Sequence, residues 1–114
     1  LEALAGRAPI PVEIEAVPPQ RLPSAVEAAA YFVVAESLTN LAKYAEASGA
    51  SIRAMREDSH LVVEVQDDGK GGADPAQGTG LRGLADRVAA LDGRLDVVSP
   101  PGTGTLVRAV LPCG

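Results

Sequence analysis

Three polar side chains that could hold a metal-bound phosphate recur at helical spacing in the first half of the chain. Glu36, Asn40 and Lys43 supply a carboxylate, an amide oxygen and an ammonium group, and their spacing places them on one stripe of a predicted helix. The apolar residues that should pack on a sheet follow the same repeat directly opposite: Val34, Leu38, Leu41 and Ala45. We therefore expect a helix with one buried face and one face suited to Mg²⁺ and phosphate.

Two glycine-containing segments further along the chain suggest the rest of such a site. Asp68-Gly69-Lys70-Gly71 follows a strongly apolar segment, and Gly78-Thr79-Gly80 precedes an amphipathic segment that begins at Leu81. Glycine lets the backbone turn and approach a ligand closely, and the amides at a helix start favour anions. Each feature alone has an ordinary explanation, namely a solvated helix surface, an Asp-Gly turn or a flexible loop. Together they suggest a nucleotide pocket formed by one carboxylate and two glycine turns.

The elements that must position these residues alternate between strands and helices. Alternating apolar residues and turn residues predict five strands, at 12–17, 52–56, 61–65, 95–98 and 105–111. Helical periodicity predicts two helices, one from Ser24 to about Glu46 and one from Leu81 to Leu91, with Gly93 as the C-cap glycine of the second. This order predicts an α+β fold, a two-layer α/β sandwich whose mixed, mostly antiparallel sheet has helices on one face.

Length and composition predict one domain over residues 1–114, with residues 1–8 as the end of a preceding helix or linker. Because the chain lacks an initiating Met, we expect a fragment of a longer protein. The fractions of apolar residues, 46%, and of charged residues, 22%, are ordinary for a globular domain. A net charge of −5 disfavours a nucleic-acid partner, since phosphate backbones are held by Lys and Arg patches.

Cysteine usage and hydropathy indicate the compartment. The single cysteine, Cys113, excludes a disulfide framework and a thiolate metal site, which favours a reducing, intracellular setting. No apolar run approaches the roughly 20 residues of a membrane span, and no basic and apolar leader opens the chain.

Four motifs, in this order and spacing, resemble those of the ATP-binding catalytic domain of sensor histidine kinases of the NarL-partner type. The segment Glu36-Ser37-Leu38-Thr39-Asn40-Leu41-Ala42-Lys43 resembles the N box of that family. Asp67-Asp68-Gly69-Lys70-Gly71 resembles its first glycine box, and Gly78-Thr79-Gly80-Leu81 resembles its second. Gly102-Thr103-Gly104-Thr105, followed by Leu111-Pro112, resembles its closing signature. The resemblance covers nearly the whole chain and implies the Bergerat fold, an α/β sandwich that agrees with the predicted order of elements.

The resemblance implies Mg-ATP as the ligand and assigns roles to individual residues. In the resembled family Asn40 would bind Mg²⁺. From their chemistry and helical position, we expect Glu36 to serve as the base-like catalytic residue and Lys43 to neutralise phosphate charge. Asp68 would accept a hydrogen bond from the adenine amino group, and the Thr105 hydroxyl would help to hold adenine. The remaining residues expected to bind the cofactor are Gly69, Gly71, Gly78, Thr79, Gly80 and Leu81.

The resemblance also implies partners. Histidine kinases carry the acceptor histidine on a separate helical dimerisation domain, whereas His60 falls in a predicted hairpin turn and is expected to be a surface residue. We expect that domain and a response regulator as partners, a homodimeric full-length protein, a monomeric fragment and a cytoplasmic location, with the parent protein either free or membrane-anchored.

Some observations leave alternatives open. The segment from Gly78 to Gly83 also spells a dinucleotide fingerprint, but a long loop precedes it and only a two-strand ending follows, which disfavours that interpretation. Tyr44 stands where the N box usually has His, and Gly72 and Ala73 replace an apolar or aromatic residue. The alternatives to a histidine kinase are an ATPase or serine kinase of the same fold, or a non-catalytic module that binds a nucleotide or a partner.

Overall fold

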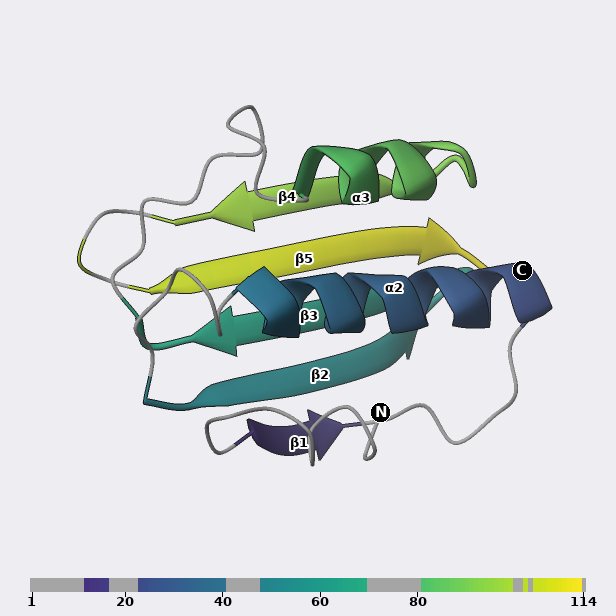
Figure 1. Ribbon diagram of the computed structural model, residues 1–114. Helices are drawn as coiled ribbons and strands as arrows, with labels where there is room; N and C mark the ends of the chain where they lie inside the picture. The colour runs from purple at the N-terminus through teal and green to yellow at the C-terminus, as the bar shows by residue number, and fades with distance from the viewer. Residues whose placement is uncertain are drawn as a thin grey trace.

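Two helices cover one face of a mixed β-sheet in the computed structural model of the chain (Figure 1). The structure describes residues 12–16, 23–40, 48–69, 81–99, 102 and 104–113. In chain order the elements are β1 (Val12–Ala16), α2 (Ser24–Asn40), β2 (Ala50–Glu57), β3 (His60–Asp67), α3 (Leu81–Ala89), β4 (Arg94–Val98) and β5 (Thr105–Pro112). This order confirms the predicted α+β sandwich with helices on one face.

The strands lie in the order β1-β2-β3-β5-β4, and their directions confirm the predicted mixed, mostly antiparallel sheet. β1 is parallel to β2, and the pairs β2–β3, β3–β5 and β4–β5 are antiparallel. In the chain, β3 precedes α3 and β4 follows it. In the sheet, these two strands are separated by β5, which is antiparallel to both. A dinucleotide fingerprint requires a helix that joins neighbouring parallel strands, so the sheet order argues against that alternative.

The core lies between the helices and the sheet, because alternate residues of β2, β3 and β5 face the helices. β3 contributes Leu61, Val63 and Val65, each of which is buried. The other members of the core come from both helices, β2, β5 and the residue after β5: Val26, Ala29, Val33, Val34, Leu38, Ile52, Ala54, Leu84, Val88, Val107, Ala109, Leu111 and Cys113. Burying one Val or Leu side chain favours folding by about 1.5–3 kcal/mol, so this layer holds the two helices on the sheet.

The buried face of α2 differs from the predicted apolar stripe. Its buried residues are Val26, Ala29, Val33, Val34, Ser37 and Leu38. Asn40 lies one turn after Ser37, so it borders the buried face, and its amide nitrogen is itself buried. Val34 and Leu38 of the predicted apolar stripe are buried as expected, but the prediction that Asn40 lies directly opposite the buried face is wrong. The expected continuation of the helix to Glu46, with Leu41, Lys43 and Ala45, lies outside the described residues.

The two predicted turns that the structure describes depend on residues in the left-handed region. The hairpin between β2 and β3 turns at Asp58, whose φ is 54°, between the strands predicted at 52–56 and 61–65. After α3 the residue with positive φ is Asp92, at 59°, rather than the predicted Gly93. Gly93 is required for space instead, since a Cβ there would lie 2.6 Å from the carbonyl oxygen of Val110. No helix among the described residues is long and apolar enough to span a membrane.

Candidate functional site

Those residues predicted to do chemistry that the structure describes gather at one end of the helix-covered face. Figure 1 shows that α2 and β3 both end there, and that α3 and β5 both begin there. The register sets Asp67, the last residue of β3, between Ala50 of β2 and Thr105 of β5. This end of the sheet therefore brings together the N-box helix, the first glycine segment and the closing segment, which are far apart in sequence.

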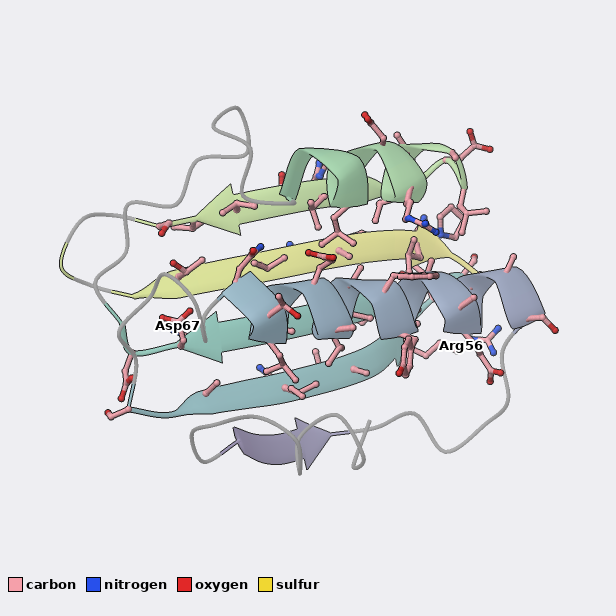
Figure 2. The ribbon with its side chains drawn as sticks, viewed as in Figure 1. Arg56 and Asp67 are labelled. Carbon is pink, nitrogen blue, oxygen red and sulfur yellow. The ribbon has the colours of Figure 1, made fainter. Side chains whose placement is uncertain are left out.

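The Asp67 carboxyl is buried on the helix-covered side of this end (Figure 2). It shares the side of β3 that carries Val63 and Val65, since side chains alternate along a strand. Only 8% of Asp67 is exposed, and Oδ1 accepts a hydrogen bond of 2.8 Å from the Gly69 N–H. A carboxylate has about four acceptor positions, so Asp67 retains capacity for a further donor.

The surroundings of Asp67 raise the pKa of its carboxyl. Burial is the largest cause, because it penalises the charged form, and the nearby Asp68 charge acts in the same direction. Hydrogen bonds from the backbone N–H groups of Gly69 and Thr105 oppose the rise. The result is a buried acceptor partly stabilised by amides, which would gain from a ligand that donates a hydrogen bond.

Gly104 brings the start of β5 against the backbone of Asp67. Its φ is +84°, which an L side chain rarely adopts, and a Cβ there would overlap the carbonyl oxygen of Asp67. This close approach explains why the closing signature has a glycine at position 104. Only glycine lets the turn before Thr105 approach the end of β3 this closely.

Thr105 lies beside Asp67 on the same side of the sheet. Its hydroxyl oxygen is 2.6 Å from Oγ of Ser99, which follows β4. A hydroxyl can donate one hydrogen bond and accept others, so this pair fixes the orientation of Thr105 without exhausting its capacity. Ser99 could not be identified from the sequence, because nothing in the spacing of Ser99 and Thr105 predicts their contact.

Two polar atoms on the sheet-facing side of α2 are buried without a hydrogen-bond partner among the described residues. They are Oγ of Ser37 and Nδ2 of Asn40. Buried polar groups almost always have partners, so each such atom calls for an explanation. The two ends of an amide are nearly indistinguishable in shape, and a half-turn of the Asn40 side chain would present its oxygen in the same place. An unpartnered amide at the end of α2 fits a site for Mg²⁺-bound phosphate, since amide oxygens are suitable Mg²⁺ ligands.

Glu36 faces α3, one turn before Asn40. It lines a cleft between the two helices together with Phe32, Gly83, Leu84 and Arg87. The Arg87 guanidinium lies 4.0 Å from the centre of the Phe32 ring, a cation–π contact that links α2 to α3. Sequence reasoning missed Phe32 and Arg87, which meet only after the helices have packed on the sheet.

Asp68 has a different environment from the one predicted. Oδ1 accepts hydrogen bonds from the N–H groups of Ser48 (2.8 Å) and Gly49 (3.1 Å), and Oδ2 accepts one from the Ser48 hydroxyl (2.6 Å). Those bonds, first of all the one from the Ser48 hydroxyl, lower the pKa of the Asp68 carboxyl. Asp68 is exposed and both of its oxygens are engaged by the segment before β2. The geometry therefore favours Asp67 over Asp68 as the acceptor inside the site.

Other predicted site residues are only partly described. Gly69 is buried and donates its N–H to Asp67. Leu81 is the first residue of α3. The predicted site residues that lie outside the described part of the chain are Lys43, Gly71, Gly78, Thr79 and Gly80.

Comparison with protein-family models matches residues 25–114 to the family described as histidine kinase-, DNA gyrase B- and HSP90-like ATPase. A sensor-like histidine kinase of Chloroflexus aurantiacus is 35% identical over an alignment that covers 98% of this chain and 20% of that protein. The oxygen sensor histidine kinase NreB of Staphylococcus carnosus is 32% identical, with 82% of this chain and 28% of that protein covered. The chain thus spans less than a third of the length of these relatives.

Solved structures show the same fold. The histidine kinase domain of the blue-light activated histidine kinase EL346 from Erythrobacter litoralis superposes with a TM-score of 0.78 at 28% identity, covering 97% of this chain and 55% of that chain. The histidine kinase AdeS of Acinetobacter baumannii gives a TM-score of 0.67 at 16% identity, with 97% and 58% covered. At that identity the likeness to AdeS concerns the fold alone.

Proposed function

This chain belongs to the histidine kinase-, DNA gyrase B- and HSP90-like ATPase family and is an ATP-binding catalytic domain of the sensor histidine kinase type; we propose that it binds Mg-ATP where α2 and β3 end and transfers the γ-phosphate to a histidine on a separate domain. The observation that carries the proposal is the Asp67 carboxyl, buried with spare acceptor capacity at the end of the sheet where α2 also ends.

We assign adenine recognition to Asp67, with Thr105 beside it. A buried carboxylate that accepts the exocyclic amino group of adenine would gain a charge-assisted hydrogen bond in a poorly hydrated place. Asp67 meets this requirement better than Asp68, whose two oxygens are already hydrogen-bonded to Ser48 and Gly49. The Thr105 hydroxyl, held by Ser99, lies on the same side and is suited to a further polar contact with the base.

We assign the metal and the phosphates to the end of α2 and to the glycine segments. The Asn40 oxygen would ligate Mg²⁺ and Lys43 would offset phosphate charge. When bound, Mg²⁺ neutralises charge on the transferring phosphoryl group. The backbone at Gly69 and Gly71 would approach the base, and the backbone of the second glycine segment, at Gly78, Thr79, Gly80 and Leu81, would surround the phosphates.

Glu36 is our candidate for the base-like residue. It lies one turn before Asn40 in the cleft between α2 and α3, and this position supports a role at the phosphate end of the site rather than at the adenine end. A carboxylate there could accept the proton of an attacking imidazole or hold a metal-bound water. We expect Glu36→Gln to lower the phosphotransfer rate by about 10²–10⁴-fold, while Glu57→Gln at the far end of β2 should not. Equal rates for the two variants would remove Glu36 from this role.

The proposed reaction also needs an acceptor histidine and a protein that receives the phosphate, and these define the expected partners. The acceptor would be a histidine on a dimerisation domain of the same full-length homodimer, and a response regulator would receive the phosphate. The greater length of the relatives supports further domains in the parent protein. Because ATP is the substrate, we place the domain on the cytoplasmic side.

Nucleotide titration tests the proposal. The chain is titrated with ADP and with a non-hydrolysable ATP analogue, with and without Mg²⁺, beside an Asn40→Ala variant and with NAD as a control. We expect saturable binding that Mg²⁺ strengthens, a smaller Mg²⁺ effect in the variant, and no binding of NAD. Binding of NAD that ignores Asn40, or no adenine-nucleotide binding, would contradict the proposal.

A further inference from the structure

Asp68 joins two chain segments just beyond the paired ends of β2 and β3. The last pair of that ladder is Ala50 with Asp67. Beyond it, the Asp68 carboxylate accepts hydrogen bonds from both N–H groups of Ser48 and Gly49 and from the Ser48 hydroxyl, and the Asp68 N–H donates to the Gly49 carbonyl at 3.3 Å. We call these residues, Ser48, Gly49 and Asp68, the Asp68 latch.

The latch acts on the backbone that carries Asp67. Asp68 stands between Asp67 and Gly69, which are themselves joined by the hydrogen bond from the Gly69 N–H to the Asp67 carboxylate. On the other side, the turn at Gly104 lies against the carbonyl of Asp67. The end of β3 is therefore held from the β2 side by the latch and from the β5 side by Gly104. With its backbone fixed from both sides, the Asp67 carboxyl can keep one direction.

We propose that Asp68 is a positioning residue for the nucleotide site: by holding Ser48 and Gly49, it fixes the exit of the chain from β3, and thereby the Asp67 carboxylate and the Gly69 amide. This inference rests on the proposed function. Asp68 itself does not touch the nucleotide, because its oxygens are occupied. Its effect is preorganisation, since an acceptor that must be ordered during binding gives weaker affinity than one already in place.

The proposal assigns different consequences to neighbouring substitutions. Asp68→Asn keeps the size of the side chain but removes the acceptor for at least one of its donors, because an amide nitrogen cannot accept. Ser48→Ala removes only the hydroxyl donor and leaves the three hydrogen bonds of the latch that have backbone N–H donors. Asp58→Asn is a matched control, since Asp58 is also an exposed turn aspartate, lies in the hairpin at the other end of β3, and has a φ of 54° that asparagine tolerates.

The test is calorimetric titration of the unaltered chain and these three variants with ADP, recording the dissociation constant and the binding stoichiometry separately. We expect Asp68→Asn to raise the Kd for ADP about tenfold at unchanged stoichiometry, since the groups that the latch holds would then have to be ordered during binding. Ser48→Ala should raise the Kd less, and Asp58→Asn should not change it. A merely structural role would lower the stoichiometry, because part of the protein would be unfolded, and leave the Kd of the folded part unchanged.

The outcomes separate this inference from the function on which it rests. Equal Kd values for the unaltered chain, Asp68→Asn and Ser48→Ala would overturn the positioning role and leave ATP binding intact. A lower stoichiometry at the original Kd would also overturn it. Absence of ADP binding by the unaltered chain would overturn the proposed function and the inference together.

Discussion

Asp67 and Asp68 are consecutive residues at the end of β3, yet their carboxyls lie in opposite surroundings. Asp67 is buried on the helix-covered side and its pKa is raised, chiefly by burial. Asp68 is exposed on the β2 side and its pKa is lowered, chiefly by the Ser48 hydroxyl. This difference in environment shows two roles that an aspartate side chain can have. A buried carboxyl with spare acceptor capacity is suited to a ligand, whereas an exposed carboxyl whose two oxygens both accept hydrogen bonds from Ser48 and Gly49 is suited to holding the backbone.

The largest effect should come from the glycine that brings β5 against Asp67. Gly104→Ala and Gly102→Ala both place a side chain at a φ of +84°, but only the Gly104 variant would overlap another atom, the Asp67 carbonyl oxygen. The backbone strain shared by both should cost about 1–2 kcal/mol, and overpacking at Gly104 should add about 1–3 kcal/mol. Urea unfolding of the two variants measures the difference.

Binding gives a second measure of the same pair. Gly104→Ala should also weaken ADP binding, because it displaces the backbone of Asp67, while Gly102→Ala should not. Equal free energies of unfolding and equal Kd values for the two variants would show that the close approach at Gly104 does not define the site.

The next effect is expected at Asp67 itself. Asp67→Asn should weaken ADP binding roughly 10–100-fold, the usual value for one hydrogen bond to a charged group. The melting temperature at neutral pH should stay the same or rise, because the variant no longer buries a charge, and the amide oxygen can still accept from Gly69. Asp68→Asn should do the reverse to stability and lower the melting temperature. If Asp67→Asn lowered the melting temperature but left ADP binding unchanged, Asp67 would have the structural role that we assign to Asp68, and the assignment would be contradicted.

A smaller effect is the pH dependence of stability, which has opposite signs at the two residues. The folded-state pKa of Asp68 lies below the ordinary 3.8, so the stability it contributes is present above that value and is lost as the pH falls through its folded pKa. The folded-state pKa of Asp67 lies above 3.8, so its ionisation costs stability as the pH rises through its folded pKa.

Thermal melts of the two Asn variants over this range measure that difference. The destabilisation by Asp68→Asn should be full at neutral pH and fade on acidification below 3.8. Any stabilisation by Asp67→Asn should likewise appear only at the higher pH. The same sign of pH dependence for both variants would contradict the contrast between their environments.

The sequence predicted the elements well because apolar periodicity records which side of each strand or helix is buried. The prediction was weakest where a shift of one residue along a strand or helix decides which side of that element a side chain faces. The resemblance assigned the adenine contact to Asp68, whereas the buried carboxyl on the helix-covered side is that of Asp67, because side chains alternate along a strand. On α2, Asn40 was expected opposite the apolar stripe, yet its amide nitrogen is buried, as is Oγ of Ser37, for which nothing was expected from the sequence.

Contacts between distant segments could not be predicted from one sequence. The hydrogen bonds from Ser48 to Asp68 and the contact of Arg87 with Phe32 depend on how the packed elements meet. Motif resemblance identified the family without these contacts, because the glycines and the N-box residues are local in sequence. The roles of Lys43, Gly71, Gly78, Thr79 and Gly80 stay predictions.

The central claim is that Asp67 recognises adenine at the end of the helix-covered face, and base discrimination tests it most directly. Titration with ADP and GDP compares a base that presents an amino donor at its sixth position with one that presents an oxygen acceptor there. We predict that the unaltered chain binds ADP far more tightly than GDP. Asp67→Asn should remove most of this preference, whereas Asp68→Asn should weaken ADP binding but leave the preference for ADP over GDP in place. Equal binding of ADP and GDP by the unaltered chain, or a preference that survives in Asp67→Asn, would contradict the account.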